Sequence, residues 1–418
     1  MKYTRPRGTQ DLFGDSMVRW RWVEDKLARL AASYGYSEIR TPIFEMSDLF
    51  IRTVGEATDI VTKEMYAFKD RKGRDLTLRP ENTAPVMRAF IENGLQRSGG
   101  VSRFFYIGPM FRYDRPQAGR YRQFHQFGAE AIGSDNPAVD AEIIDMSLKI
   151  YRTFEFQGLE IRLNSVGCPA CRPAYRQILG SSLENLKGEL CDDCAQRYAV
   201  NPMRIFDCKE CGPVKARLPV MTDHLCADCS EHFASLQRIL REMGISFVHD
   251  PLLVRGLDYY TRTAFEILHP GLGGQNALCG GGRYDGLAED CGAGRVPAIG
   301  FSAGIERLLE NIPDKAVVGI DFSKADIFFV VPQKEGYARA MNLASQLRDR
   351  GMRVEVDLSG RAIKKQIKAA SESGASHAVF TGIEELRENA AAVKNLGSGE
   401  QCRVPFADLA AFLEKERE

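Results

Sequence analysis

The spacing of apolar residues at the start of the chain predicts a helix followed by a strand. In residues 17–34 the apolar side chains recur on one helical face, and Gly35 then acts as a stop signal. Residues 36–45 form an extended segment that contains Pro42, and proline suits the edge or the end of a strand better than the centre of a sheet. We therefore expect an amphipathic helix and a strand interrupted or ended by Pro42.

Strand patterns continue to residue 165, stop, and then return. Before the break, strands are predicted at 74–79, 103–113, 122–133 and 159–165, with a helix at 136–154. Residues 167–230 hold paired cysteines and few strand signals. After the break come a helix at 231–243, strand signals at 245–268 and a strand–helix unit at 297–312. Because the strand signals resume, we expect one domain that is interrupted by an insertion.

The pattern changes again from Asp326 onward, where short apolar strands alternate with helices. Strands are predicted at 327–331, 353–357, 377–382 and 390–396, and helices at 336–350, 361–373 and 406–416. Short apolar strands between helices are typical of a covered, mostly parallel sheet. The four expected regions are a first catalytic part at 1–166, a Cys-rich insertion at 167–244, a second catalytic part at 245–320 and an α/β domain at 325–418.

Length and composition agree with a multidomain globular protein. A chain of 418 residues suggests two to four domains, and 44% hydrophobic with 27% charged residues is ordinary for a soluble protein. No apolar run approaches the roughly 20 residues of a membrane helix, and the N-terminus lacks the apolar core of a secretory signal. We expect a cytoplasmic protein with no membrane partner. Lysine plus arginine equals aspartate plus glutamate, at 56 each, which neither supports nor excludes a nucleic-acid partner.

Eight of the 11 cysteines form four CxxC pairs within the predicted insertion. The pairs are Cys168/Cys171, Cys191/Cys194, Cys208/Cys211 and Cys226/Cys229. The first two pairs are separated by 19 residues and the last two by 14, at or near the spacing of zinc ribbons. In a reducing compartment this pattern favours metal binding over disulfides. Metal-bound thiolates would stabilise an insertion that has little apolar surface of its own.

We expect one or two structural zinc ions, with the first two pairs holding one and the last two the other; the sequence leaves a crossed arrangement open. Because the candidate active-site motifs lie outside the insertion, their chemistry is expected to survive metal removal better than RNA-dependent steps do. His224 and His232 are expected to be solvated rather than ligands, and Cys279, Cys291 and Cys402 to be ordinary thiols.

Five short motifs carry candidate chemistry. In chain order they are Leu78–Thr83, Phe111–Glu130, Leu253–Ile267, Gly280–Leu287 and Gly300–Leu308. A glutamate beside small polar groups can hold an ammonium group, and arginines at a strand end suit phosphate and carboxylate. In the third motif, alternating apolar residues predict a strand whose buried arginine needs a partner. Glycines in the fourth permit close approach of a ligand. Each motif alone also fits an ordinary turn, hairpin or packing element, so only the set of five motifs points to a function.

Together, and in this order, the motifs resemble those of class II aminoacyl-tRNA synthetases, and specifically the histidyl-tRNA synthetase family. The resemblance covers nearly the whole chain and rests on RGTQDLFG, TLRPENTA, RYRQFHQFGAE and RGLDYYTRTAFE. It implies an α+β protein in which an antiparallel-sheet catalytic domain with a Cys-rich insertion precedes an α/β anticodon-binding domain. It also implies ligation of L-histidine to tRNA(His) through a histidyl-adenylate, with ATP and Mg²⁺, in a homodimer formed through residues 17–42.

The resemblance implies that three arginines bind the reacting groups. Arg112 would bind the ATP α-phosphate and the histidine carboxylate, and Arg307 the γ-phosphate. Arg255 would approach the α-phosphate from the other side, where other class II enzymes place a metal ion. Fixed arginines on both sides of a phosphorus centre stabilise its extra negative charge without a protein nucleophile or base.

The resemblance also implies a pocket that selects histidine. Its expected residues are Glu81 and Thr83 at the α-ammonium, Gln126 beside them, Glu130 and Tyr260 at the imidazole, and Tyr259 lining the pocket. A carboxylate and a phenol can supply polar partners for both ring nitrogens. One departure is Asn82, where many members of the family have glycine, and this puts the local backbone in doubt.

Contacts with tRNA are expected from two places. They are Arg115, Gln117 and Arg122 in the loop of the second motif, and Arg361, Lys364 and Lys365 near the start of a predicted helix. Basic side chains near a helix N-terminus suit RNA phosphates, although a solvated helix face would have the same composition.

Three other functions remain to be weighed. A histidine-sensing regulatory paralogue would bind histidine without ligating it, but such regulators typically lack the C-terminal domain and the intact Arg255 region. A zinc-dependent nucleic-acid-binding module would explain the cysteines and not the five ordered motifs. A synthetase for threonine, proline or glycine is disfavoured by RGLDYY and by Glu130.

Overall fold

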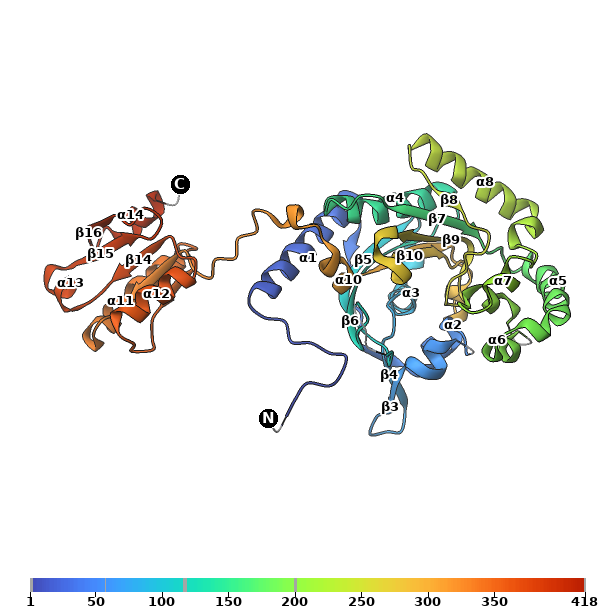
Figure 1. The fold of residues 1–418 in the computed structure, drawn as a ribbon, viewed down its shortest axis with the longest axis horizontal. Coiled ribbons are helices and arrows are strands. Elements are labelled where there is room, and N and C mark those ends of the chain that lie inside the picture. Colours follow the sequence, from blue (N-terminus) through green and yellow to red (C-terminus); the bar gives the residue numbers. More distant parts are fainter. Residues whose placement is uncertain (1–2, 57, 116–118, 199–200, 417–418) are drawn as a thin grey trace. The chain divides into compact units, whose positions relative to one another are not determined.

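The computed structural model describes residues 3–56, 58–115, 119–198 and 201–416. By its internal contacts the chain divides into two compact units, Met1–Val318 and Gly319–Glu418. Each unit has a buried apolar core of its own, and Figure 1 colours the first from blue to orange and the second orange to red. The five motifs and the eight paired cysteines all belong to the first unit.

An eight-stranded sheet forms the centre of the first unit, in the order β1-β5-β6-β11-β10-β9-β7-β8 (Figure 1). In that order the strands are Ser37–Glu38, Ser102–Phe111, Gln123–Ile132, Ala298–Gly304, Ala277–Arg283, Thr261–Leu268, Glu160–Ser165 and Val248–His249. The strands from β5 to β7 are antiparallel to their neighbours, whereas β1 and β8 join the two edges in parallel. Strands from both sides of the insertion therefore share one sheet.

Helices α1 (Asp15–Ser33) and α4 (Pro137–Thr153) cover one face of this sheet (Figure 1). Side chains alternate between the two faces of a strand, so Phe127, Ala129 and Ala131 of β6 point into the core under the helices. The residues between them belong to the opposite face, which carries the candidate site. Among the described residues, no helix combines the length and apolar character needed to cross a membrane.

A small three-stranded antiparallel sheet, in the order β2-β4-β3, stands beside the main sheet. Its strands are Phe44–Met46, Asp75–Leu78 and Tyr66–Lys69, and helices α2 (Ser47–Val54) and α3 (Thr83–Glu92) pack close to it. The prediction of a single strand at 36–45 is wrong. It is split between β1 and β2, which belong to different sheets, because Pro42 cannot donate to a ladder.

The insertion is helical and has an apolar core. It contains α5 (Arg172–Asn185), α6 (Asp192–Arg197), the 3₁₀ helix η4 (Pro202–Asp207) and α7 (Gly212–Lys215), and ends in α8 (Ala227–Glu242). Tyr175, Leu179, Leu183 and Phe206 are among its buried side chains. The expectation that the insertion has little apolar surface is therefore wrong, because the helices bring together apolar residues that are scattered in the sequence.

The second unit is an α/β fold with a five-stranded sheet in the order β13-β12-β14-β15-β16. The strands are Val354–Val356, Ile327–Val330, His377–Phe380, Ala390–Asn395 and Gln401–Pro405; the helices are α11 (Tyr337–Asp349), α12 (Ile363–Glu372), α13 (Ile383–Glu388) and α14 (Leu409–Lys415). The predicted mostly parallel sheet is mixed, because β15 and β16 run antiparallel to their neighbours. Strand β16 and helix α13 are short and were not predicted from the sequence.

Candidate active site

A cavity of about 340 Å³ opens on the face of the main sheet away from α1 and α4. It brings together residues from all five motifs. Its lining includes Glu81, Thr83, Arg112, Gln126, Arg255, Tyr259, Tyr260, Gly280, Tyr284, Gly300, Ser302 and Arg307. These residues come from β6, β10 and β11, from the end of β5, from the start of α3, from α10 and from the loop before β9. The antiparallel pairing of β6, β11 and β10 thus assembles in space what the sequence keeps apart.

Glu130 lies fully buried beneath the wall of this cavity. Its carboxylate accepts a hydrogen bond from Thr83 Oγ1 at 2.8 Å, a longer one from the Tyr106 hydroxyl at 3.4 Å, and a short one from the Tyr284 hydroxyl. Burial outweighs these donors and raises the pKa of Glu130 to about 8. An uncharged buried carboxyl group held by hydroxyls is a suitable partner for a weakly basic ring such as imidazole.

Glu81 is also buried, and it caps the start of α3. It accepts hydrogen bonds from the backbone N–H of Thr83 at 2.7 Å and of Ala84 at 3.0 Å, while the Tyr259 hydroxyl lies 3.5 Å away. Burial raises the pKa of this carboxyl group. The Asn82 backbone has φ −121°, which any residue can adopt. The departure from glycine at this position therefore leaves the local backbone unstrained.

Arg112 and Arg307 enter the cavity from different elements. Arg112 follows β5, and its Nε donates to the Pro80 carbonyl at 2.8 Å, which ties it to the first motif. Arg307 lies on α10 (Ile305–Asn311) and donates a short hydrogen bond to the Ala277 carbonyl. Arg120 also lines the cavity and pairs with Asp114 at 3.0 Å. Three guanidinium groups so placed suit a polyphosphate.

Arg255 is not in a strand, contrary to the alternation seen in the sequence. It lies in the loop between β8 and β9 and forms a short ion pair with Glu266 of β9. Although burial opposes its charge, the Glu266 carboxylate raises the pKa of the Arg255 guanidinium, so the group stays cationic. Any side chain at Gly280 on β10 would overlap this guanidinium, which explains the glycine there.

Gln126 and Tyr260 complete the lining. Gln126 Nε2 lies 3.4 Å from Ser302 Oγ, and its buried Oε1 has no hydrogen-bond partner among the residues that the structure describes. That oxygen is available to a ligand donor such as an ammonium group. The ring of Tyr260 packs against that of Tyr259, with centroids 4.8 Å apart. Both tyrosines therefore lie in the wall next to Arg255.

The structure describes five of the six expected tRNA contacts, and these five lie outside the cavity. Arg115 is exposed, and Arg122 stacks 3.9 Å over the Tyr113 ring; Gln117 lies outside the described residues. Lys364 and Lys365 are exposed in the first turn of α12. Arg361 precedes that helix and pairs with Asp357 at 2.7 Å, because the helix begins two residues later than predicted.

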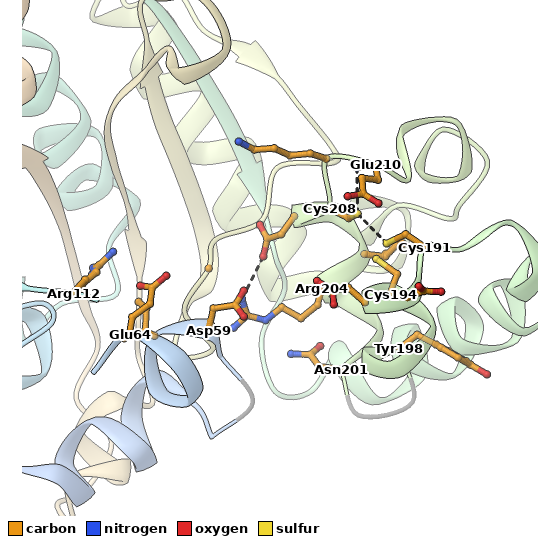
Figure 2. A pocket seen from close by; sticks show the side chains of 17 residues that line it. Asp59, Glu64, Arg112, Cys191, Cys194, Tyr198, Asn201, Arg204, Cys208 and Glu210 are labelled. Carbon is orange, nitrogen blue, oxygen red and sulfur yellow. Dashed lines mark hydrogen bonds and ion pairs between the residues drawn. The ribbon is translucent and has the colours of Figure 1, made fainter. Parts of the chain in front are cut away.

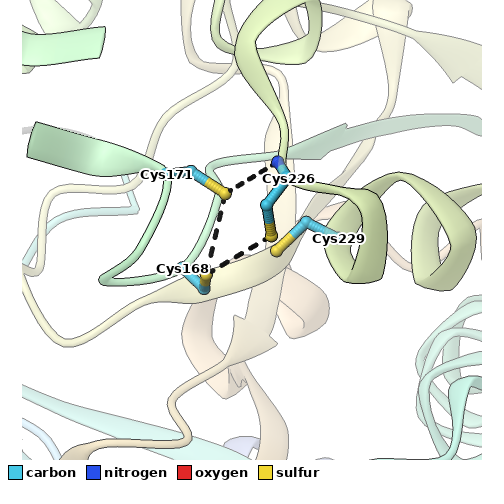
Figure 3. Close-up of side chains that lie close together, drawn as sticks. All are labelled: Cys168, Cys171, Cys226 and Cys229. Carbon is cyan, nitrogen blue, oxygen red and sulfur yellow. Dashed lines mark hydrogen bonds between the residues drawn. The ribbon is translucent and has the colours of Figure 1, made fainter. Parts of the chain in front are cut away.

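The eight paired cysteines form two groups of four, and each group brings its sulfur atoms within 4.8 Å of one another. Their pairing is nested rather than sequential. One group is Cys168, Cys171, Cys226 and Cys229 (Figure 3), and the other is Cys191, Cys194, Cys208 and Cys211. The expected grouping by neighbouring pairs is thus not the arrangement found, because α5 and α8 bring the first and last pairs together at the base of the insertion.

The geometry of both groups fits a tetrahedral ion. Sulfur atoms in such a site lie about 3.8 Å apart, given a Zn–S distance of about 2.3 Å. The separations are 3.6 Å for Cys168–Cys171, 3.9 Å for Cys168–Cys226 and 3.7 Å for Cys191–Cys208. Although burial opposes ionisation, nearby backbone N–H groups lower the pKa of the Cys168 and Cys208 thiols to about 7.

His232 differs from its expected role. It is buried, not solvated, and lies 3.0 Å from Asp140, outside both cysteine groups.

A second cavity, of about 620 Å³, lies between the insertion and the catalytic face (Figure 2). Figure 2 shows Arg112 and Glu64 on one side of it and Cys191, Cys194 and Cys208 on the other. It shares Ile60, Arg112 and Gly256 with the first cavity. The second cysteine group therefore stands close to the candidate active site.

Sequence reasoning missed several residues of the site. Tyr106 and Tyr284 bind Glu130, Glu266 pairs with Arg255, and Arg120 lines the cavity. For Tyr284 a signal was available, since it lies in the glycine-rich motif beside β10. Tyr106 and Glu266 reach the site only through strand register, which the sequence does not reveal.

An antiparallel sheet carries four arginines around one cavity on its open face, and the comparisons place the chain among the class II aminoacyl-tRNA synthetases. A histidyl-tRNA synthetase family model matches residues 8–170 and 212–308, and an anticodon-binding domain model matches 326–416. The chain is 46% identical over 417 residues to the histidine–tRNA ligase of Halothermothrix orenii, covering 99% of this chain and 100% of that one. It therefore belongs to the histidyl-tRNA synthetase family.

Solved structures agree with this assignment. The structure of apo histidyl-tRNA synthetase from S. aureus has a TM-score of 0.83 at 39% identity, covering 99% of this chain and 100% of that chain. A structure described as an ATP phosphoribosyltransferase regulatory subunit/histidyl-tRNA synthetase from Bacillus halodurans has a TM-score of 0.64 at 20% identity. At that identity the second likeness shows the fold alone, so the regulatory paralogue is not favoured.

Proposed function

We propose that the chain ligates L-histidine to tRNA(His) in two steps, with ATP as the co-substrate and histidyl-adenylate as the intermediate. The observation that carries this proposal is the buried Glu130 carboxyl, held by three hydroxyls beneath a cavity whose rim bears Arg112, Arg255 and Arg307. A neutral carboxyl suits an imidazole, and the arginines suit a triphosphate. One cavity thus offers partners for both substrates.

The arginines would act on the reacting phosphorus centre from two sides. When the histidine carboxylate attacks the α-phosphate, the P–O bond to pyrophosphate breaks and negative charge builds on the equatorial oxygens. Arg112 lies at the end of β5 and Arg255 in the loop before β9, so the charge would be held between them. Arg307 on α10 would hold the γ-phosphate of the leaving pyrophosphate. Mg²⁺ would accompany the ATP.

Glu81 and Gln126 would fix the amino end of histidine. Glu81 is buried and held by two N–H groups of α3, and the buried Gln126 Oε1 offers an acceptor. Thr83 binds Glu130, which links the ammonium end of the pocket to the ring end. Tyr259 and Tyr260 would close the pocket around the ring.

The tRNA would contact both units. Arg115, Gln117 and Arg122 would meet its acceptor end beside the cavity, and Arg361, Lys364 and Lys365 would meet its anticodon region at α12. Five of these six side chains are positive, and those of Arg115, Arg361, Lys364 and Lys365 are exposed, which suits phosphate contacts.

Each four-cysteine group would hold one structural zinc ion. The sulfur separations fit tetrahedral thiolate geometry, and the first group joins the two ends of the insertion. The ion would supply crosslinks within the insertion and no chemistry in the reaction.

The protein is proposed to work as a cytoplasmic homodimer. Residues 17–42 would form the interface, and exposed apolar side chains follow on the small sheet, namely Ile43, Phe44, Met46 and Phe68. A second copy of the chain would cover this face. Sedimentation equilibrium should give twice the monomer mass, whereas a monomer at micromolar concentration would contradict the proposal.

ATP–pyrophosphate exchange with each of the twenty amino acids tests the function. Exchange should depend on histidine alone, and Glu130→Ala should raise the KM for histidine far more than the KM for ATP. Glu289→Ala, which removes an exposed carboxylate from α9 (Leu287–Asp290), is the matched control. Faster exchange with another amino acid would overturn the proposal.

A further inference from the structure

The loop that carries Arg255, Tyr259 and Tyr260 is held from the insertion. The ten residues between Asp250 and Thr261 contain no helix or strand, yet they line the active-site cavity. A loop without its own ladder needs partners from neighbouring elements to keep one conformation. Its partners therefore decide how precisely its cavity-lining side chains are placed.

Arg204, in η4 of the insertion, supplies one of these partners. Its Nη2 lies 3.0 Å from Asp258 Oδ1, and its Nη1 lies 3.4 Å from Asp207 Oδ2. Asn201 Nδ2 donates to the same Asp258 oxygen at 3.2 Å. Figure 2 shows Arg204 reaching across from the insertion. The Arg204 side chain is 16% exposed and that of Asp258 is 36% exposed, so this ion pair is partly shielded from water.

Asp258 is fixed on its other side by α2. Its backbone N–H donates to the Val54 carbonyl at 3.1 Å, and Gly55 has a φ of 103° with its Cα facing the Asp258 carboxylate. A side chain at position 55 would overlap that carboxylate. Asp258 thus links three parts of the chain: the loop, the end of α2 and the insertion.

Arg172 supplies the second partner, at the other end of the loop. Its Nη2 donates a short hydrogen bond to the Tyr260 carbonyl, and its Nε donates to the Val166 carbonyl at 3.3 Å. Arg172 is the first residue of α5. Its guanidinium therefore bridges the root of the insertion and the backbone of a tyrosine that lines the substrate cavity.

Each of these arginines is connected to one cysteine group. Arg172 directly follows Cys171, a member of the group in Figure 3. Arg204 lies in η4, which ends at Asp207 immediately before Cys208 of the other group. The position of each guanidinium is thus set by a turn whose sulfur atoms would be ligands.

We propose that Arg172 and Arg204 are positioning residues that hold the Arg255–Tyr260 loop in its active conformation, and that the two cysteine groups act on histidine activation through them. This inference rests on the proposed function. It replaces the expectation that histidine activation would survive metal removal, because the insertion and the loop share direct contacts. The insertion therefore contributes to the histidine site, because its two arginines hold the loop that lines the site.

The first test compares Arg204→Gln with Arg204→Lys in histidine-dependent ATP–pyrophosphate exchange. Glutamine keeps the stem and removes the charge, so the KM for histidine should rise about three- to tenfold. The kcat should fall as well, because Arg255 lies in the same loop. The KM for ATP should change less, because Arg112 and Arg307 lie on other elements. Lysine should restore part of the loss. Arg217→Gln, which breaks an ion pair with Glu189 inside the insertion, is the matched control and should leave both KM values unchanged.

Amide hydrogen exchange of the peptide covering 251–262 gives a second measurement that does not depend on activity. Amide hydrogen exchange of this peptide should be faster in Arg204→Gln, in Arg172→Gln and in wild-type protein stripped of metal. It should not be faster in Arg217→Gln. A folding failure of Arg172→Gln would be seen as faster exchange throughout the unit, and Arg204→Gln then decides the result.

The outcomes separate this inference from the proposed function. Wild-type protein that fails to activate histidine would overturn the function itself. The positioning role is wrong if wild-type protein activates histidine and the Arg172 and Arg204 variants show the same KM for histidine. Their amide hydrogen exchange at 251–262 would then also have to equal that of the wild type. Metal-stripped protein with freely titratable thiols and an unchanged loop would refute the link to the cysteine groups.

Discussion

Gly300 of β11 lies directly opposite Glu130 of β6, and any side chain at position 300 would overlap the Glu130 carboxylate. Because residue 300 is a glycine and has no side chain, the Glu130 carboxylate can occupy the space next to it. From this contact follows the first prediction. Gly300→Ala should displace Glu130 and lower kcat/KM for histidine by more than about tenfold, the loss expected for one misplaced charged hydrogen-bonding group.

Steady-state exchange kinetics over a histidine titration would measure the effect of Gly300→Ala. Gly294→Ala is the control, because a Cβ there meets no atom within 4 Å. Equal kinetics for the two variants would show that Glu130 tolerates displacement and does not read the ring.

The pKa of Glu130 predicts how stability depends on pH. The folded-state pKa of about 8 is above the unfolded value of 4.5. Between these values the unfolded chain is ionised while the folded chain keeps the proton, so unfolding releases a proton and stability falls as the pH rises. The slope is at most about 1.4 kcal/mol per pH unit. It should vanish below 4.5 and above about 8.

Glu130→Gln removes this slope and leaves all other groups in place. The Tm of the variant minus the wild-type Tm should therefore increase as the pH is raised from 5.5 to 8. This Tm difference should level off at higher pH. Thermal scans without histidine at matched scan rates would measure it. A Tm difference that stays constant with pH would mean that Glu130 is ionised in the folded protein at neutral pH.

Arg255 is predicted to act on the reacting phosphate rather than on folding. Arg255→Ala should lower kcat for histidine activation by about 10²–10³, the cost of losing one fixed donor to developing charge. Arg295→Ala is the control, since its side chain is 54% exposed and lies 3.9 Å from its nearest carboxylate. A normal kcat in Arg255→Ala would reduce this residue to the structural partner of Glu266.

The nested cysteine pairing can be distinguished from the sequential one by zinc content. Cys168→Ser with Cys226→Ser damages one group in the nested arrangement, so about one equivalent of zinc should remain per chain. The same double variant would damage both groups in a sequential arrangement. Cys168→Ser with Cys191→Ser should give the reverse result and lose both ions. Elemental analysis after dialysis measures the zinc, and wild-type protein with less than half an equivalent would contradict both arrangements.

The exposed lysines of α12 are predicted to act on tRNA only. Lys364→Ala with Lys365→Ala should raise the KM for tRNA in aminoacylation and reduce its salt dependence, because two phosphate contacts are lost. ATP–pyrophosphate exchange should be unchanged. Lys368→Ala, one turn later on the same helix, tests whether the effect is specific to the N-terminal turn. Unchanged charging in the double variant would leave these lysines as a solvated helix face.

The sequence by itself determined the family, and its motifs named most of the residues that the structure brings to the cavity. Motifs such as TLRPENTA and RGLDYYTRTAFE consist of consecutive residues, so they can be recognised in the sequence without knowledge of the fold. The amphipathic helix α1 and the strands β5 and β6 were predicted within one or two residues, because their periodicity depends only on the two faces of each element.

Tertiary structure decided what depends on contacts between distant segments. Strand register brought Tyr106 and Gly300 to Glu130, and the fold of the insertion paired Cys168 with Cys226 and not with Cys191. The loop around Arg255 looked like a strand because its apolar residues alternate, yet its backbone partners come from α2 and the insertion. Periodicity reports which side of an element is buried; it carries no information about which other element does the burying.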